Sequence, residues 1–315
     1  MPENGQSGRT VHDRGAARGT RARSQNGAAV SKHPGVRTLA GDAWRRFRRL
    51  PAPIAGAAVL ALVVGLAVFA PLVAGHDPLA QNVARGARPP SPEHWFGTDR
   101  LGRDLFARIV YGARISLSIG FVAVGLAISA GTLIGLIAGY LGRRVDAVLS
   151  AAIDLMLAFP SIILAIAITT VLGASITNLT LAIGIVYVPQ YARLARSSVM
   201  VIKENDYIEA ARAIGASTAA ILARHLLPNI AGPLLAQATL GIATAELEAA
   251  GLSYLGLGAR PPAPEWGALL NDARDYWLSA PWALIFPGIS ITVLVLAFNL
   301  LGDGLRDALD PGRAA

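Results

Sequence analysis

The sequence predicts an all-α membrane protein with six transmembrane helices and both termini in the cytoplasm. Of its 315 residues, 53% are hydrophobic and only 15% are charged, whereas soluble domains carry roughly 25% charged residues. Several apolar runs are long enough to cross a bilayer, since about 20 helical residues span its hydrocarbon core. The side on which most basic residues fall predicts the orientation.

The first 50 residues are rich in Arg, Gly and Ser and contain few large apolar side chains. Such a segment cannot bury enough apolar surface to fold, so we predict a disordered, basic cytoplasmic tail at residues 1–50. It ends in "WRRFRRLP", directly before an apolar run. Paired arginines can also mark an export signal, but the long run and the further spans favour a positively charged anchor.

Six apolar runs follow the tail. They are residues 54–74, 115–140, 147–172, 179–199, 230–247 and 284–301. We divide this part of the chain into residues 51–112, which hold the first span and an outer interfacial segment, and residues 113–311, which hold a five-helix core. Thr98 is the expected N-cap of an interfacial helix that leads into the second span.

Three features inside the spans carry structural predictions. Gly131, Gly135 and Gly139 recur every four residues in the second span, which predicts the close approach of another helix. The third span contains Asp154 and Pro160, and we expect the proline to kink it. Asp154 is either a gate or path residue, or a helix-end carboxylate paired with an arginine of the "GRRVD" turn or with a neighbouring subunit.

The distribution of basic residues sets the topology. Twenty of the 28 Lys and Arg residues lie in the tail and in the loops on the same side, and eight lie in the opposite loops. The positive-inside rule therefore places both termini in the cytoplasm. The net charge of +8 is explained by topology, and we expect no nucleic-acid partner.

Catalytic and nucleotide-binding signatures are missing. The only two lysines are Lys32 and Lys203, neither of which follows a glycine, and the five histidines form no HExxH pair. A P-loop is therefore absent. The lack of cysteine excludes disulfides and thiolate chemistry. We expect no catalytic residue, no metal and no cofactor in this chain, and any ATP that drives it must be bound by another chain.

A polar segment interrupts the apolar runs at residues 206–229. Asp206 and Glu209 have the spacing of a capping box, which predicts a helix from about residue 207 to residue 213. Gly215 is expected to end it in a left-handed conformation, Ser217 to cap a second short helix, and Pro228 to stop that helix.

The first of these short helices has two candidate surfaces. Ile208, Ala211 and Ile214 lie roughly along one side, while Glu209 and Arg212 have the spacing of an i, i+3 pair. The helix could lie on anionic lipid, but its acidic first half lacks the basic face that lipid favours. Docking of a protein partner is the preferred interpretation.

Long motifs in this chain resemble a known family. "EAARAIGAS" with "HLLPN" is similar to the EAA loop of permease subunits of ABC importers. The stretches "HWFGTDRLGRDLFARIVYGARIS", "LAFPSIILAI", "GLSYLGLGARPPAPEWG" and "FNLLGDGLRDALDP" resemble the second permease subunit of the dipeptide, oligopeptide and nickel branch. The resemblance covers residues 51–311 and implies the type I importer permease fold in the bacterial inner membrane.

The resemblance also implies a set of partners and a site. The partners are a second permease, two ATP-binding subunits that hold ATP and Mg²⁺, and an extracytoplasmic substrate-binding protein. The EAA coupling loop would occupy about residues 200–229, and its contacts to the ATP-binding subunit would be made by Glu209, Ala210, Ala211 and Gly215. Cargo would be a di- or oligopeptide, with nickel or a metal chelate as the alternative.

Two acidic residues depart from the family pattern. Glu246 and Glu248 lie near the outer end of the fifth span, where many peptide permeases have one acidic residue, at a position nearest to Ala249. They are either solvated carboxylates at a helix end or an acidic mouth for cationic cargo. With Asp154 and Pro160 they complete the candidate path or gate residues.

Two other classes of membrane protein would show different sequence features. A self-contained secondary transporter would show inverted repeats and ion-binding carboxylates at the midplane, but we find no clear repeat, and the acidic residues lie near the span ends. An intramembrane enzyme would need paired His, Asp or Ser side chains within the spans, and no histidine lies in any of the six.

Overall fold

The computed structural model describes residue 47 and residues 50–309. Contacts divide the chain into two units, residues 1–37 and 38–315, and the described residues all belong to the second. The predicted tail at residues 1–50 therefore lies almost wholly outside the described part. Within that part the chain is helical, and its one isolated β-bridge joins Thr98 and Asp104. The all-α prediction is confirmed.

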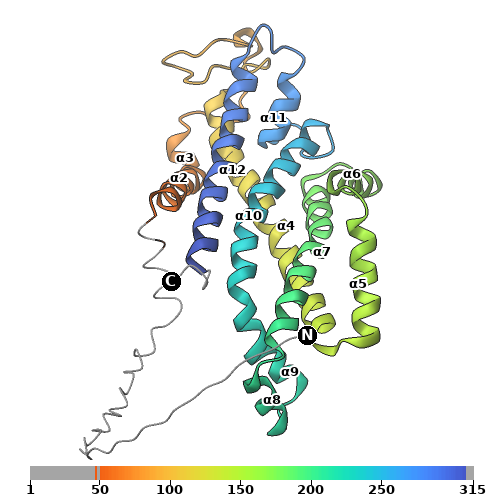
Figure 1. Ribbon diagram of the computed structural model, residues 1–315. Coiled ribbons are helices and arrows are strands. Elements are labelled where there is room, and N and C mark those ends of the chain that lie inside the picture. Colours follow the sequence, from red (N-terminus) through yellow and green to blue (C-terminus); the bar gives the residue numbers. More distant parts are fainter. Residues whose placement is uncertain (1–46, 48–49, 310–315) are drawn as a thin grey trace, which may run out of the picture. The chain divides into compact units, whose positions relative to one another are not determined.

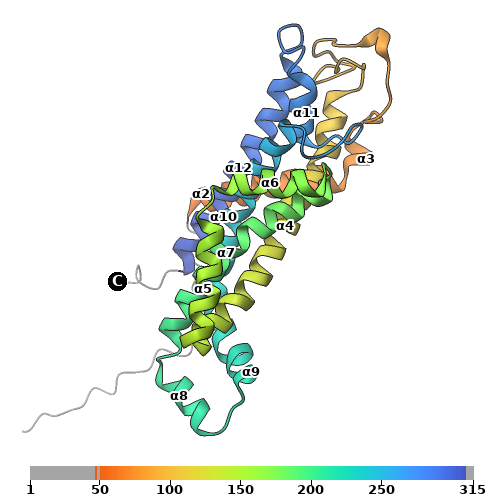
Figure 2. The same ribbon diagram turned by 90° about the vertical axis from the view of Figure 1, so that its right-hand side faces the viewer.

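The helices follow one another through short connections, apart from the loops on either side of α11 and before α4 (Figure 1). In chain order they are α2 (Pro51–Val68), α3 (Ala70–Val73), the 3₁₀ turn η1 (Val83–Arg85), α4 (Leu105–Leu141), α5 (Arg143–Leu157), α6 (Ser161–Leu172), α7 (Ile176–Ile202), α8 (Asp206–Ala213), α9 (Thr218–Ile221), the π turn η2 (Leu222–Leu226), α10 (Leu227–Tyr254), α11 (Trp266–Ala273) and α12 (Trp282–Leu309). The long helices α4, α7, α10 and α12 run alongside one another, with α8 and α9 at one end and α11 at the other (Figures 1 and 2).

Four described helices are long and apolar enough to cross a bilayer: α2, α4, the continuous stretch Thr218–Tyr254, and α12. The pair α5 and α6 would make a fifth span, but its halves meet at 89°. The third predicted span is thus not one kinked helix but two helices. Proline lacks the N–H that a continuing helix requires and restricts the residue before it, so the chain turns at Pro160.

Helix α7 contains the predicted fourth span but is not among these four. Its polar residues, including Gln190, Arg193 and Arg196, lower its mean hydropathy. The helix is nevertheless buried along much of its length, between α4 on one side and α5, α6 and α10 on others. The prediction of six spans therefore remains a prediction.

The start of the second long helix differs from the prediction. Helix α4 begins at Leu105, and its N-cap is Asp104, whose Oδ1 accepts a hydrogen bond from the Ala107 N–H at 2.7 Å. Thr98 instead lies in the preceding turn and donates its hydroxyl to the Arg85 carbonyl at 2.8 Å. The expected interfacial helix is simply the first part of α4, since nothing interrupts α4 between Leu105 and Leu141.

The predicted glycine contact is confirmed, and the partner is α7. A Cβ on Gly131 would lie 2.7 Å from the Tyr191 Cβ, and one on Gly139 would lie 2.9 Å from the Val199 Cβ. Distances this short leave no room for a side chain, so these positions let the two backbones approach. Glycine also allows α2 to approach α12, where a Cβ on Gly56 would meet the Ala297 carbonyl at 2.7 Å.

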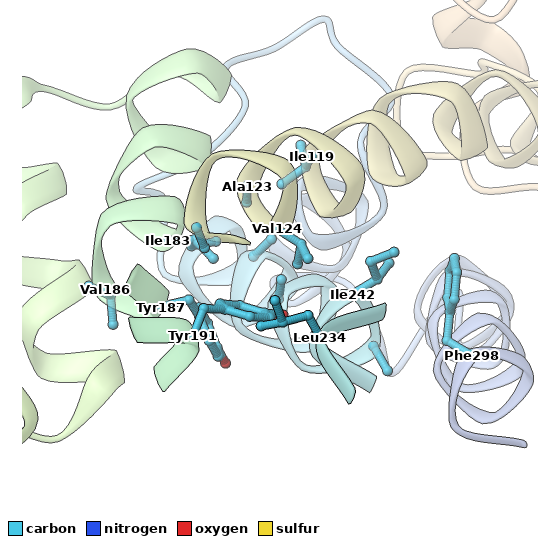
Figure 3. Packing of buried hydrophobic residues seen from close by; sticks show 14 of the residues in the cluster. Ile119, Ala123, Val124, Ile183, Val186, Tyr187, Tyr191, Leu234, Ile242 and Phe298 are labelled. Carbon is cyan, nitrogen blue, oxygen red and sulfur yellow. The ribbon is translucent and has the colours of Figure 1, made fainter. Parts of the chain in front are cut away.

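A single apolar cluster joins the long helices. Figure 3 shows side chains of α4, α7, α10 and α12 gathered in it. The labelled residues are Ile119, Ala123 and Val124 of α4, Ile183, Val186, Tyr187 and Tyr191 of α7, Leu234 and Ile242 of α10, and Phe298 of α12. Burial of these side chains positions the ends of the helices, where the polar groups are found.

Candidate functional site

The first candidate site is the α8–α9 segment, residues 203–221, which lies at one end of the long helices (Figure 2). Helix α8 follows α7 after a short turn and is tied to the end of α4. The Lys203 ammonium donates to the Gly139 carbonyl at 3.0 Å. The Arg212 guanidinium donates to the Tyr140 hydroxyl at 3.2 Å and lies 5.0 Å from the centre of the Tyr140 ring. The segment is therefore held in place on the helices.

The end of α8 is built around Gly215. The Ala216 N–H donates to the Ala211 carbonyl at 3.0 Å, and the Gly215 N–H donates to the Arg212 carbonyl at 2.9 Å. This pair of bonds is a Schellman motif, which needs a left-handed residue at the position of Gly215. Gly215 has φ of +82°, as predicted. Nothing lies within 4 Å of the place where its Cβ would be, so the turn is open to solvent.

The beginning of α8 was predicted incorrectly. Its N-cap is Asn205, with no side-chain capping bond, and Asp206 is already inside the helix. The capping box therefore does not form, and the acidic residues Asp206 and Glu209 simply occupy the first turn, where a carboxylate interacts favourably with the helix dipole. Ser217 does cap α9, accepting from the Ala220 N–H at 3.3 Å.

Helix α9 does not end at Pro228. The chain passes from α9 through the π turn η2 directly into α10, where Pro228 lies in the first turn. Proline is accepted there because the first N–H groups of a helix have no intrahelical partner. The segment therefore contains one separate short helix, α8, and a second short helix that is continuous with α10.

The two faces of α8 are sharply different. Ile208 and Ala211 are buried, at 0% and 6% exposure, whereas Ile214 is 86% exposed, so the three do not share one face as predicted. Glu209, Ala210 and Gly215 are exposed as well. Among the described residues no ion pair joins Glu209 to Arg212, because Arg212 turns toward Tyr140. Of the four predicted coupling residues, three face solvent and Ala211 anchors the helix.

The second candidate site is a cavity of about 470 Å³ beside the bend between α5 and α6. Its lining combines apolar and polar side chains. These are Leu157, Ser161, Val186, Tyr187, Gln190, Arg193, Leu194 and Ser197. The polar residues of α7 in this lining were missed from sequence, because isolated Gln, Ser and Tyr residues in an apolar run give no pattern.

Three of the four predicted path or gate residues lie around this cavity. Pro160 precedes Ser161 at the bend, the Ser161 hydroxyl donates to the Glu248 carboxylate at 2.8 Å, and Asp154 accepts from the Arg193 guanidinium at 2.7 Å. Asp154 is thus paired with α7 and not with the "GRRVD" turn. Arg193 and Asp154 are 59% and 62% exposed, so the pair lies at the surface of this chain.

Glu246 lies elsewhere, because residues two apart on a helix face nearly opposite directions. Its side chain is 1% exposed, and a Cβ on Gly120 of α4 would be 3.9 Å from its Oε2. Neither carboxylate oxygen has a hydrogen-bond partner among the described residues. The interpretation of Glu246 as a solvated carboxylate at a helix end is wrong, and Glu246 does not belong to the cavity.

A second buried carboxylate, Glu265, precedes α11. Its two oxygens accept hydrogen bonds from the N–H groups of Gly267 and Ala268, each at 2.8 Å, and so cap α11. Burial raises the pKa of Glu265 above its ordinary value, although the two N–H groups act in the opposite direction. Trp266 then donates its indole N–H to the Ile109 carbonyl at 2.9 Å, which fastens α11 to α4.

The described chain is a set of long apolar helices in which a short helix with an exposed face, α8, lies between α7 and α10. Comparison with known proteins identifies the class of protein. Residues 131–314 match the family described as binding-protein-dependent transport system inner membrane component, and residues 38–90 match the N-terminal transmembrane domain of oligopeptide transport permease C. The chain belongs to this family of inner-membrane transport components, as an ABC transporter permease subunit.

Relatives cover most of the chain. It is 50% identical over 270 residues to the dipeptide transport system permease protein DppC of Alkalihalophilus pseudofirmus, covering 86% of this chain and 89% of that protein. It is 45% identical over 290 residues to the glutathione transport system permease protein GsiD of Escherichia coli, covering 91% and 95%. The protein is therefore a multi-pass protein of the bacterial inner membrane.

The solved structures show the fold. A chain of the inward-facing MetNI methionine ABC transporter superposes with a TM-score of 0.53 at 20% identity, covering 64% of this chain and 96% of that chain. The predicted importer permease fold is confirmed.

Proposed function

We propose that this chain forms half of the membrane path of an ATP-driven importer for short peptides. The observation that carries the proposal is the 50% identity to the dipeptide permease DppC over 86% of the chain. The relative GsiD is named for glutathione, which is itself a small peptide. Nickel or a metal chelate remains the alternative cargo. A self-contained secondary transporter is set aside, because the chain belongs to a family of ABC permease subunits.

The proposed assembly contains this chain, a second permease, two ATP-binding subunits with ATP and Mg²⁺, and an extracytoplasmic substrate-binding protein. Catalysis of ATP hydrolysis belongs to the partners, since this chain contains no P-loop. In the proposed orientation, the α8–α9 segment and both termini lie in the cytoplasm, as the basic residues predict.

The α8–α9 segment is the proposed contact with an ATP-binding subunit. Its outer surface presents Glu209, Ala210 and Gly215 around the exposed apolar side chain of Ile214. At 86% exposure, Ile214 offers a large apolar side chain that a docked partner can remove from water. Its inner surface is packed against the long helices and bonded to α4 through Arg212 and Lys203. A displacement of α8 would therefore be transmitted directly to α4 and α7.

The residues that line the cavity beside α5 and α6 form the proposed wall of the path. Its polar side chains, Gln190 and Ser197 of α7 and Ser161 of α6, can form hydrogen bonds with peptide groups, whose N–H and C=O must be satisfied when they leave water. Three charged side chains lie near the cavity: Glu248, and Arg193 with its partner Asp154. The carboxylates can interact with the amino terminus of a short peptide, and Arg193 can interact with its carboxyl terminus.

The test compares two glycine variants in membranes from cells that produce the whole transporter. Gly215→Asp is placed in the α8–α9 segment, and Gly256→Asp serves as the control. Gly256 also has a positive φ, of +84°, and also has nothing within 4 Å of its Cβ position. It follows α10 with the same pair of hydrogen bonds, from the Gly256 N–H to the Ser253 carbonyl and from the Leu257 N–H to the Leu252 carbonyl. The two substitutions therefore impose the same charge and a similar backbone strain, but only the first lies in the proposed docking surface.

Wild type and both variants are purified from gently solubilised membranes, the bound chains are identified by mass spectrometry, and ATPase activity is measured. We expect an ATPase and a second permease with wild type and with Gly256→Asp, and loss of the ATPase with Gly215→Asp. Equal ATPase recovery with both variants would rule out the docking surface. Growth on dipeptides as sole nitrogen source, compared with growth under nickel limitation, then distinguishes the two cargoes.

A further inference from the structure

Two histidines and an aspartate meet at the end of the long helices opposite α8 and α9. The residues are His76, in the turn after α3, His94, in the loop before α4, and Asp104, the N-cap of α4. One ligand atom from each lies within 4.8 Å of the other two. Figure 1 shows the loop that carries the histidines at this end, near the start of α4. The sequence does not reveal this group, because the three residues share no short spacing.

Asp104 is held firmly at the centre of the group. It is 4% exposed, and its Oδ1 is occupied by the Ala107 N–H at 2.7 Å. Its Oδ2 is turned toward the histidines, 2.8 Å from His94 Nδ1 and 4.0 Å from His76 Nδ1. One oxygen of the carboxylate thus serves the helix cap, and the other is shared by two imidazole nitrogens.

The group opens onto a cavity of about 180 Å³. The cavity is lined by His76, Asp104, Trp95 and Phe106 among others, and also by Glu93. The Glu93 carboxylate binds the Arg85 guanidinium at 2.6 Å. Apolar walls with a few converging polar groups are typical of small-ligand sites, and the space is sufficient for an ion with a water molecule.

The donor set selects a class of ion. Imidazole nitrogen with carboxylate oxygen suits Zn²⁺ and neighbouring divalent transition metals, whereas Mg²⁺ and Ca²⁺ prefer oxygen ligands alone. Bonds of about 2.0–2.1 Å in a tetrahedral site place the donor atoms roughly 3.3 Å apart. The separation of 2.8 Å between His94 and Asp104 has to open slightly, and that of 4.0 Å between His76 and Asp104 has to close.

The side chains can make this adjustment. His76 is 44% exposed, so its ring can rotate with little loss of packing, while Asp104 and His94 need to move only a few tenths of an ångström. The hydrogen bond between His94 and Asp104, the N-cap of α4, accounts for the position of His94. It does not account for His76, whose ring centre lies 5.1 Å from that of His94 and whose Nδ1 lies 4.0 Å from the same carboxylate oxygen.

We propose that His76, His94 and Asp104 form a binding site for a divalent transition-metal ion of the Zn²⁺ type, with water completing the coordination. The ion joins the turn after α3, the loop before α4 and the first turn of α4. The site lies apart from both the α8–α9 segment and the cavity beside α5 and α6, and it does not depend on the proposed function.

The test measures Zn²⁺ binding to the full chain, purified with its accompanying subunits through a tag without histidine and stripped with a chelator. Titration is followed with a chromogenic zinc indicator, and Co²⁺ is used in parallel because its visible spectrum reports tetrahedral nitrogen and oxygen ligands. Three variants are compared with wild type: His76→Ala, Asp104→Asn and His225→Ala. Asparagine is also a good N-cap, so Asp104→Asn keeps the start of α4.

We expect the wild type to bind one equivalent of Zn²⁺ that His76→Ala loses or binds at least tenfold more weakly. Asp104→Asn is expected to weaken binding as well, whereas His225→Ala, in the π turn at the other end, leaves it unchanged. Mg²⁺ in large excess should not displace Zn²⁺. Equal zinc binding by wild type and His76→Ala, or no binding by wild type at micromolar Zn²⁺, would overturn the site. These measurements require no transport, so their failure leaves the peptide-importer proposal untouched.

Discussion

Replacement of Gly135 by alanine tests whether the contact between α4 and α7 holds the fold together. Gly135 is buried in α4, and a Cβ there would lie 2.6 Å from the Ala195 Cβ and 2.8 Å from the Arg196 nitrogen, and closer still to the Ala192 carbonyl oxygen. Two of these three atoms belong to the backbone of α7, so they cannot move aside as a side-chain end could. The two helices have to separate.

The same helix supplies a matched control in Gly125, where nothing lies within 4 Å of the Cβ position. Alanine is favoured over glycine in a helix by about 1 kcal/mol, and both variants receive this gain. Overpacking of a tight contact costs about 1–3 kcal/mol. With a backbone obstacle at Gly135 we expect the upper part of that range, so the two variants should differ by roughly 2–3 kcal/mol.

The assay is thermal or denaturant unfolding of the purified chain in detergent, under conditions where wild type refolds. Gly125→Ala should be as stable as wild type or slightly more stable, and Gly135→Ala should be less stable by about 1–2 kcal/mol, after the gain in helix propensity is included. If the two variants unfold together, the close approach of α4 and α7 does not contribute to stability and the argument from the glycine spacing fails.

Three further outcomes are expected. Gly215→Asn should keep most of the transport activity, because asparagine tolerates a left-handed conformation, whereas Gly215→Ala should reduce it; equal transport rates in the two variants would contradict a role for the turn. Asp154→Asn should change the free energy of unfolding by less than about 1 kcal/mol, since its pair with Arg193 is exposed; a larger loss in a denaturation curve would show that the pair is shielded. Glu246→Gln should leave the chain at least as stable as wild type, because a buried carboxylate without a partner is costly; a lower melting temperature of the variant chain would show that the carboxylate makes a favourable contact within the chain.

In the α8–α9 segment, the features that depend on nearby residues could be predicted from the sequence. Gly215 was predicted in its left-handed turn, and Ser217 in its cap, because both depend on bonds to residues a few positions away. The N-cap was misplaced because Asp206 and Asn205 are both good capping residues, and the actual boundary depends on where α7 ends. Ile214 was assigned to the packed face although it is 86% exposed, because the helix ends just before it and its helical spacing no longer applies.

The contacts of the acidic residues could not be predicted from the sequence. Glu246 and Glu248 look equivalent in sequence, yet one is enclosed against α4 and the other contacts Ser161 at the bend of α6. Which neighbour each side chain meets depends on the rotation of α10 about its axis, and that rotation follows from packing against α4, α7, α11 and α12. The partner of Asp154 likewise lies 39 positions away in the chain.

Composition and short periodicities were sufficient to predict a helical membrane protein, the positions of its long apolar segments, the close approach of two helices at the four-residue glycine spacing, and a polar segment with a glycine turn between two helices. Burial in lipid and the helix repeat impose these properties locally. Three features are visible only in the folded chain: the bend of 89° at Pro160, the polar groups that share the cavity beside α7, and the meeting of His76, His94 and Asp104. Each of these depends on contacts between residues distant in the chain, which are set by the packing of whole helices.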